Sequence, residues 1–186
     1  MSEQPSAPPA RGDGRVERLM ARIRDVPDFP KPGIVFKDIS PLLADHTTFT
    51  EVVDALAAPF ADAGVDTVAG IEARGFVLGA PVALELGAGF VPVRKAGKLP
   101  RATHTVAYDL EYGDATLEIH QDAVAPGERV LLVDDVLATG GTLAATRQLV
   151  EACGGEVVAV AMLMELSFLP GRDAVGDLPF TVLMTV

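Results

Sequence analysis

Hydrophobic residues recur along this chain with two different periods, and the alternation of these periods predicts the order of its helices and strands. Apolar residues at helical spacing predict helices over residues 15–26, 47–64, 75–87 and 141–155. Continuous or alternating apolar runs predict strands over residues 65–72, 89–95, 129–136, 156–166 and 180–186. Strands that alternate with helices are typical of an α/β fold, so we predict a mostly parallel central sheet flanked by helices.

Three stretches depart from this alternation. Three prolines and a glycine over residues 27–40 predict a rigid, non-helical loop that ends in a short extended piece. Residues 103–120 alternate between apolar and polar positions around the sequence Tyr-Gly-Asp-Ala, which predicts a β-hairpin. Residues 1–14 are polar, rich in proline and without the apolar core of a signal peptide. We therefore expect a disordered tail before a single domain over residues 15–186.

Composition narrows the classes of function. The chain has 186 residues, of which 49% are hydrophobic and 22% charged, as in an ordinary soluble globular protein. Its net charge of -11 argues against a nucleic-acid-binding or membrane-surface protein, and its longest apolar stretch, residues 157–164, is too short to cross a bilayer. Cys153 is the only cysteine, so no intrachain disulfide can form. A reducing compartment, and hence the cytoplasm, fits best.

The clearest chemical signal follows the strand predicted over residues 129–136, where the sequence reads Val-Asp-Asp-Val-Leu-Ala-Thr-Gly-Gly-Thr. Ligands of open α/β sheets bind beyond the carboxyl ends of the strands, which is where this segment lies. Glycines allow a backbone to approach a phosphate closely, and the start of a helix adds partial positive charge. The loop has neither the lysine of a Walker A motif nor the glycine spacing of a dinucleotide fold. It therefore fits a terminal monophosphate, held by Ala138, Thr139, Gly140, Gly141 and Thr142.

The two adjacent carboxylates suit a different group. Asp134 and Asp135 accept hydrogen bonds, so paired sugar hydroxyls, or a hydrated Mg²⁺ that bridges to such hydroxyls, are natural partners. Two neighbouring acids alone are more often solvated, and a Thr-Gly-Gly-Thr turn alone can be an ordinary turn. The complete order of strand, acids, glycine turn and helix favours a site for a sugar that carries a phosphate.

This motif resembles the phosphoribosyl-pyrophosphate motif of the type I phosphoribosyltransferases. Four further stretches resemble the members of that family that act on adenine: DFPKPGIVFKDISPLL from Asp28, GIEARGF from Gly70, VPVRKAGKLP from Val91 and YDLEYGDATLEIH from Tyr108. The resemblance implies the type I fold and transfer of a 5-phosphoribosyl group from phosphoribosyl pyrophosphate to adenine. The products would be AMP and pyrophosphate, with Mg²⁺ present, as in purine salvage. The resemblance also implies a homodimer.

By the same resemblance, the segment from Gly33 to Asp38 forms the adenine pocket. Phe36 would stack on the base and the backbone of Val35 would read its edge, as suits a flat apolar ring. Phe36 could instead be a core residue. The family often has arginine where this chain has Lys37. Lysine lacks the planar guanidinium with its parallel N–H donors, so the role of Lys37 stays open.

Two segments are implied to bind pyrophosphate. The first is the loop of Glu72, Ala73 and Arg74, with a cis peptide bond between Glu72 and Ala73, and Arg74 would face the pyrophosphate or the base as a catalytic residue. A structural ion pair between Glu72 and Arg74 is the alternative. The second segment holds three cations that suit the charge of pyrophosphate, although exposed lysines are commonly just solvated. These cations are Arg94, Lys95 and Lys98.

The hairpin over residues 103–120 is implied to be a mobile hood that excludes water from a cationic sugar transition state. Glu111 would act as general acid or base at the purine nitrogens, and Tyr112 would cover the pyrophosphate. No covalent nucleophile is required, so catalysis rests on positioning and electrostatic stabilisation. We expect no dedicated metal site in the protein, with Mg²⁺ bound mainly through the substrate, near Asp134 and Asp135.

Three alternatives remain at this stage. The same fold could act on hypoxanthine, xanthine, guanine or orotate instead of adenine. It could also serve a regulator that senses the sugar phosphate without catalysis, although the acidic charge and the hood hairpin favour an enzyme. A P-loop or Rossmann nucleotide binder is disfavoured by the missing lysine and by the glycine spacing.

Overall fold

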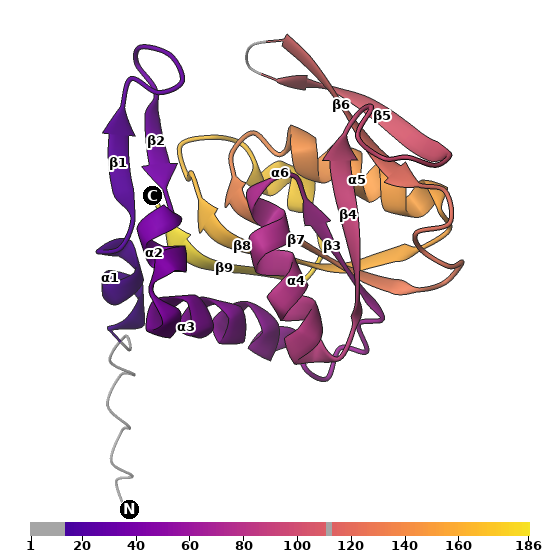
Figure 1. The fold of residues 1–186 in the computed structure, drawn as a ribbon, viewed down its shortest axis with the longest axis horizontal. Coiled ribbons are helices and arrows are strands. Elements are labelled where there is room, and N and C mark those ends of the chain that lie inside the picture. The colour runs from indigo at the N-terminus through magenta and orange to yellow at the C-terminus, as the bar shows by residue number, and fades with distance from the viewer. Residues whose placement is uncertain (1–13, 111–112) are drawn as a thin grey trace, which may run out of the picture. The chain divides into compact units, whose positions relative to one another are not determined.

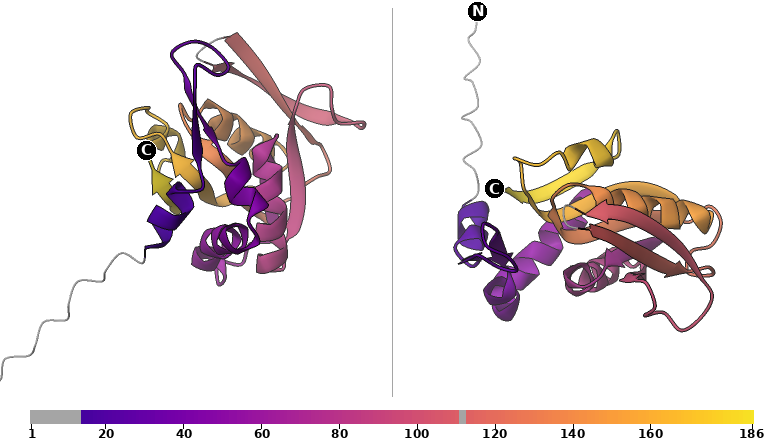
Figure 2. Two further views of the ribbon diagram at one scale, coloured as in Figure 1. Left: turned by 60° about the vertical axis from the view of Figure 1, so that its left-hand side comes forward. Right: turned by 90° about the horizontal axis from the view of Figure 1, so that it is seen from above.

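The computed structural model describes residues 14–110 and 113–186 and separates into two compact units (Figures 1 and 2). The first unit ends at Phe49 and the second runs from Thr50 to Val186. Of the tail predicted over residues 1–14, only Gly14 belongs to the described residues. No described helix has the length and apolar character that crossing a bilayer requires.

The first unit contains α1 (Arg15–Met20), β1 (Arg24–Pro27), β2 (Val35–Asp38), α2 (Ser40–Ala44) and the start of α3 (His46–Ala57). Strands β1 and β2 are antiparallel, with Arg24 opposite Asp38 and Pro27 opposite Val35. The helix predicted over residues 15–26 is therefore too long, because its last residues belong to β1. A residue before proline is pushed toward extended conformations, which explains why Val26, before Pro27, lies in a strand. The short extended piece predicted at the end of the loop is β2.

The second unit is built on a sheet of seven strands in the order β5-β6-β4-β3-β7-β8-β9. The parallel strands are β3 (Thr67–Ile71), β4 (Gly89–Lys95), β7 (Arg129–Leu137), β8 (Glu156–Glu165) and β9 (Phe180–Thr185). The hairpin of β5 (Thr103–Leu110) and β6 (Gly113–His120) is antiparallel, and β6 pairs with the end of β4 at Arg94 and Lys95. The prediction of a mostly parallel central sheet flanked by helices is confirmed.

The helices of the second unit connect these strands. They are the remainder of α3, followed by the short helix η1 (Ala58–Phe60), then α4 (Arg74–Leu86), α5 (Gly141–Ala152) and α6 (Arg172–Val175). The sequence pattern did not predict α6, because a helix of one turn shows no hydrophobic period. The last predicted strand finds its partner in β8, parallel to it, with Phe180 opposite Val160.

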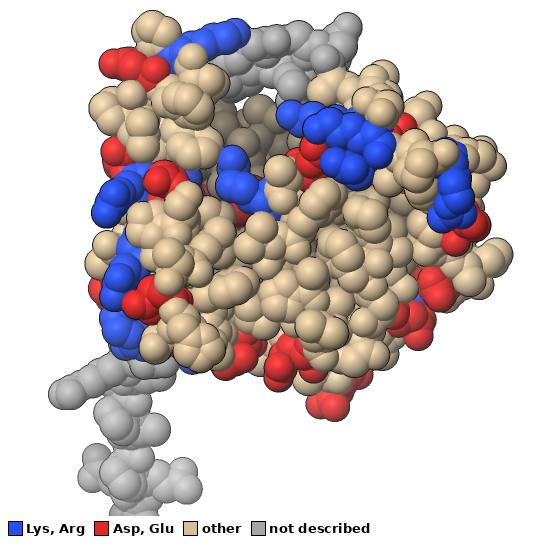
Figure 3. All heavy atoms as spheres, viewed as in Figure 1, with Lys and Arg blue, Asp and Glu red and all other residues tan. Residues whose placement is uncertain are grey.

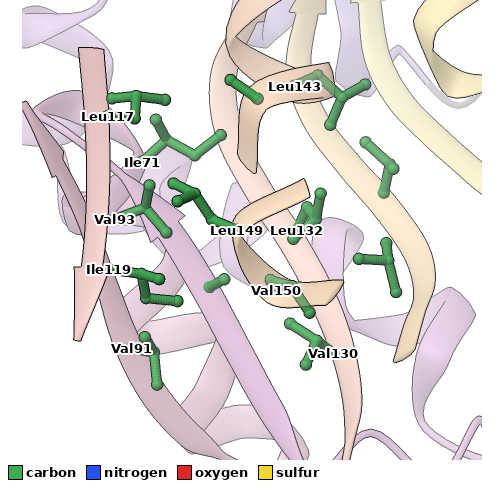
Figure 4. Close-up of a cluster of buried hydrophobic side chains, with 14 of the residues drawn as sticks. Ile71, Val91, Val93, Leu117, Ile119, Val130, Leu132, Leu143, Leu149 and Val150 are labelled. Carbon is green, nitrogen blue, oxygen red and sulfur yellow. The ribbon is translucent and has the colours of Figure 1, made fainter. Parts of the chain in front are cut away.

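One cluster of the core of the second unit lies between α5 and one face of the sheet (Figure 4). Leu149 and Val150 of α5 are fully buried against Ile71 of β3 and Val130 and Leu132 of β7. The hairpin adds buried side chains to the same cluster through Leu117 and Ile119. Most of β7 is buried, which fixes the position of its carboxyl end, where the candidate site begins.

Candidate functional site

The loop between β7 and α5 has the geometry of an anion site. Strand β7 ends at Leu137 and α5 begins at Gly141, with Gly140 as its N-cap. Gly140 has φ 86°, in the left-handed region that favours glycine. The first N–H groups of a helix have no acceptor within the helix, and they carry partial positive charge. This turn therefore directs the amides that open α5 toward the carboxyl end of the sheet, as the sequence motif predicts for a phosphate.

The two acids before this loop have different surroundings. The Asp135 side chain is only 6% exposed, and its Oδ2 accepts a hydrogen bond from Nε of Arg74. Oδ1 of Asp134 accepts the backbone N–H of Asp135 at 2.8 Å. Burial, together with the negative charge of Asp135, raises the pKa of Asp134 well above its usual range. Asp135 thus faces a permanent cation, whereas Asp134 takes up a proton more readily than an ordinary aspartate.

The start of α4 brings the Glu72–Arg74 loop to the same edge of the sheet. The peptide bond between Glu72 and Ala73 is cis, as the resemblance implies. A Cβ placed on Gly75 would lie 2.8 Å from Oδ1 of Asp134, so only glycine lets the first turn of α4 approach β7 this closely. Among the described residues, Arg74 pairs with Asp135, whereas Glu72 pairs with Arg94 and Lys98.

Glu72 is bound to the basic segment at the end of β4. Its carboxylate accepts Nζ of Lys98 at 2.6 Å, the backbone N–H of Lys95 at 3.0 Å and Nε of Arg94 at 3.3 Å. Burial raises the pKa of Glu72, but these hydrogen bonds and the charges of Lys98 and Arg94 outweigh it and leave the pKa below its usual value. Figure 3 shows Lys and Arg side chains gathered over the end of β4. The predicted cationic cluster is therefore ordered by Glu72.

Glu118 on β6 also binds this basic segment, although the sequence did not single it out. It is 4% exposed, and its Oε1 accepts the backbone N–H groups of Lys98 and Leu99, each at 2.7 Å. Alternation along β6 places Glu118 on the opposite side of the strand from Leu117 and Ile119, which suggests an exposed residue. The loop after β4 covers it instead, so Glu118 fixes the backbone that carries the cations.

Among the described residues, a hydrogen bond between side chains joins the hairpin to the start of α5, which follows the loop after β7. The hydroxyl oxygens of Tyr108 on β5 and Thr142 in the first turn of α5 lie 3.2 Å apart. Tyr108 also packs against the core below. The predicted hood residues Glu111 and Tyr112 lie outside the described residues.

The predicted base-binding residues lie in the first unit. Phe36 on β2 makes an edge-to-face contact with Phe29, with ring centroids 5.2 Å apart. Val35 is 52% exposed. Nζ of Lys37 lies 2.7 Å from Oδ1 of Asp25, its direct neighbour on β1, so the described partner of Lys37 is an acid within its own hairpin.

Comparisons with known proteins agree with these observations. The family described as "Phosphoribosyl transferase domain" matches residues 42–171. An adenine phosphoribosyltransferase from a Nocardioides species is 68% identical over 175 residues, which are 92% of this chain and 95% of that protein. A second, from Frankia casuarinae, is 61% identical over 177 residues, which are 95% of this chain and 94% of that protein.

Solved structures give the same result. The crystal structure of adenine phosphoribosyltransferase from Rhodothermus marinus has a TM-score of 0.88 and 50% identity, and it covers 92% of this chain and 98% of its own. The APRTase from Giardia lamblia, complexed with 9-deazaadenine, has a TM-score of 0.87 and 40% identity, and it covers 92% of this chain and 97% of its own. The likeness therefore extends over nearly the whole of each chain.

Proposed function

This chain belongs to the adenine phosphoribosyltransferases of the phosphoribosyltransferase family, and from that premise we propose how its residues divide the work. The enzyme transfers the 5-phosphoribosyl group of phosphoribosyl pyrophosphate to adenine, gives AMP and releases pyrophosphate, which is a step of purine salvage. A bond forms between N9 of adenine and C1 of the ribose while the bond from C1 to the pyrophosphate oxygen breaks. The observation that best supports the proposed roles is the order of elements at the end of β7, where the two acids are followed by the turn at Gly140 into α5.

The turn between β7 and α5 binds the terminal phosphate of the donor. The amides of Thr139, Gly140, Gly141 and Thr142 supply donors, and the hydroxyls of the two threonines lie at its ends. Asp135 accepts a ribose hydroxyl beside its bond to Arg74, and Asp134 completes the pair.

The pyrophosphate lies against the cis peptide loop and the basic segment. Arg74 faces the pyrophosphate from the start of α4, and its side chain is 43% exposed while it is paired with Asp135. Arg94, Lys95 and Lys98 balance the negative charge that grows on the leaving group, and Glu72 keeps two of them in place before the substrate arrives.

Mg²⁺ would be held between the protein and the donor. Carboxylate oxygens are ligands that Mg²⁺ accepts, and Asp134 and Asp135 offer them at the edge where the sugar hydroxyls would lie. Among residues 14–110 and 113–186, no three His, Cys, Asp or Glu side chains gather as a metal site. Oxygens of the donor and water would therefore supply the other ligands, and the ion would neutralise charge on the pyrophosphate.

Adenine binds at β2, where Phe36 stacks on the ring and the backbone of Val35 pairs with its edge. The hood hairpin brings Glu111 to the purine nitrogens, where it exchanges a proton, and Tyr112 to the pyrophosphate. The bond between Tyr108 and Thr142 supports a hood that acts together with the phosphate loop, since both elements share it.

A homodimer is supported by an apolar face of α4. Val77 is 43% exposed and Leu84 is 82% exposed, and residues seven positions apart lie on the same side of a helix. Large apolar side chains that are exposed together commonly mark a contact with another chain. The cytoplasm is supported by the free thiol of Cys153, the sole cysteine of the sequence.

A single incubation series tests the reaction and its base. The purified protein is mixed with Mg²⁺ and phosphoribosyl pyrophosphate, each purine base and orotate are offered separately, and nucleotide monophosphates are separated by chromatography. AMP from adenine alone is the expected result. Product from another base would support the proposed donor site and contradict the proposed adenine pocket. Binding of the donor without product from any base would favour a regulator that senses the sugar phosphate without catalysis.

A further inference from the structure

The short segment before α6 lies directly against the phosphate loop. Gly171 is buried, and a Cβ placed on it would lie 2.3 Å from the carbonyl oxygen of Ala138 and 2.8 Å from Cγ of Leu137. Its backbone has φ -56° and ψ -28°, which any residue adopts. Glycine is therefore required at this position by the closeness of the loop and not by the backbone conformation.

The loop between β7 and α5 also has a glycine at its contact with the segment around Gly171. A Cβ on Gly140, in the middle of the phosphate loop, would lie 2.6 Å from Cβ of Ala174 and 3.0 Å from the carbonyl oxygen of Gly171. The backbone N–H of Leu166 also donates to the carbonyl of Leu137 at 3.0 Å. Two glycines, one on each segment, thus bring the two backbones into contact at the loop that leads into α5.

An ion pair anchors the first residue of α6, which follows Gly171, to the sheet. Nε and Nη2 of Arg172 donate to the two carboxylate oxygens of Glu165 at 2.6 and 2.7 Å, and the Glu165 side chain is 7% exposed at the end of β8. The same guanidinium lies 4.4 Å from the ring centroid of Phe180 on β9. A bidentate pair fixes direction as well as distance, so the segment is held against two strands.

We propose that Gly171 and Arg172 are positioning residues for the phosphate loop: together they hold its amides in the directions that a terminal phosphate requires. The proposal rests on the proposed function of that loop. Carbon and oxygen atoms rarely approach closer than about 3.3 Å, so a methyl group at Gly171 would displace the loop by about 1 Å. Displacements of about that size are enough to spoil a preorganised site.

The test compares AMP with adenosine, which lacks the phosphate. Isothermal calorimetry gives both dissociation constants. The dissociation constant of adenosine divided by that of AMP measures how much the phosphate contributes to binding. We expect Gly171→Ala to lower that ratio about tenfold or more, the equivalent of one charge-assisted hydrogen bond. Gly155→Ala is the matched control. Its Cβ would meet Cγ1 of Val124 at 2.6 Å, but it lies beyond the far end of α5, a helix about 18 Å long. Its ratio should equal that of the wild type.

A second pair of variants decides the matter if Gly171→Ala does not fold. Arg172→Ala removes the ion pair with Glu165 and should lower the ratio about threefold to tenfold. Arg172→Lys should recover part of the lost ratio, since lysine keeps the charge but not the two parallel N–H donors. Wild-type ratios in a folded Gly171→Ala protein, or in both Arg172 variants, would overturn the proposal. Equal binding of AMP and adenosine by the wild type would instead show that the loop does not bind the phosphate, and both proposals would fall.

Discussion

Replacing Asp135 with asparagine separates the two tasks assigned to this carboxylate, which are to hold Arg74 and to bind the ribose. Breaking a buried ion pair costs about 3–5 kcal/mol when the remaining charge is left without water. The Arg74 side chain is 43% exposed and keeps its hydration, so we expect the free energy of unfolding to fall by only about 1–2 kcal/mol. A lost hydrogen bond to a charged group costs about 1.5–3 kcal/mol, which predicts that the donor binds about 10- to 150-fold more weakly.

The assay is steady-state kinetics with varied phosphoribosyl pyrophosphate at saturating adenine, accompanied by urea unfolding. Asp134→Asn is the matched control. Because the pKa of Asp134 is raised, the folded state binds its proton more tightly, and the stability of the wild type falls as pH rises from the usual carboxyl pKa to the folded one. The Asp134→Asn variant should lose that pH dependence of stability, and its affinity for the donor should fall less than that of Asp135→Asn. Equal donor affinity in wild type and Asp135→Asn would refute the role of Asp135.

Three further predictions concern the surroundings of the site. Burial raises the pKa of Glu72, but hydrogen bonds from basic partners outweigh burial and hold that pKa below its usual value. The ionised Glu72 side chain therefore stabilises the folded state above the usual carboxyl pKa, and this stabilisation is lost as pH falls through the pKa of the folded state. Glu72→Gln should therefore flatten the acid side of the stability curve and raise KM for the donor; an unchanged curve would contradict this. Gly70→Ala would place Cβ 2.6 Å from the Phe90 ring and should lower the free energy of unfolding by about 1–3 kcal/mol, whereas Gly89→Ala, with its nearest contact at 3.5 Å, should cost less than about 1 kcal/mol. Leu84→Asp should leave the thermal midpoint of the isolated subunit unchanged and shift sedimentation from dimer to monomer, and a variant that stays dimeric would exclude this face as the interface.

The order of elements in the sheet was predictable because the hydrophobic pattern along each strand reflects its burial. Residues 156–166 read as a continuous apolar run, and nearly all of β8 is buried. The hairpin of β1 and β2 was not predicted, because pairing of Arg24 with Asp38 is a contact between distant residues and a local pattern does not record it. The proline after Val26 was the local signal that an extended segment follows the first helix.

The sequence displays the chemical groups at the end of β7, but it does not display which residues contact them. The adjacent acids and the glycine turn are contiguous, so the sequence displays them together. Arg74 and Asp135 are 61 positions apart, and the sequence offered Glu72 as the nearer partner for that arginine. Gly171 carries no chemical group at all, and only the three-dimensional contact with Ala138 shows why a side chain is excluded there.

A crystal structure of the protein with AMP tests most directly whether the end of β7 is the nucleotide site. We predict a phosphate within hydrogen-bonding distance of the amides from Thr139 to Thr142, with the ribose hydroxyls on Asp134 and Asp135. A phosphate bound instead at Arg94 and Lys98, with no ligand at the turn into α5, would contradict that assignment.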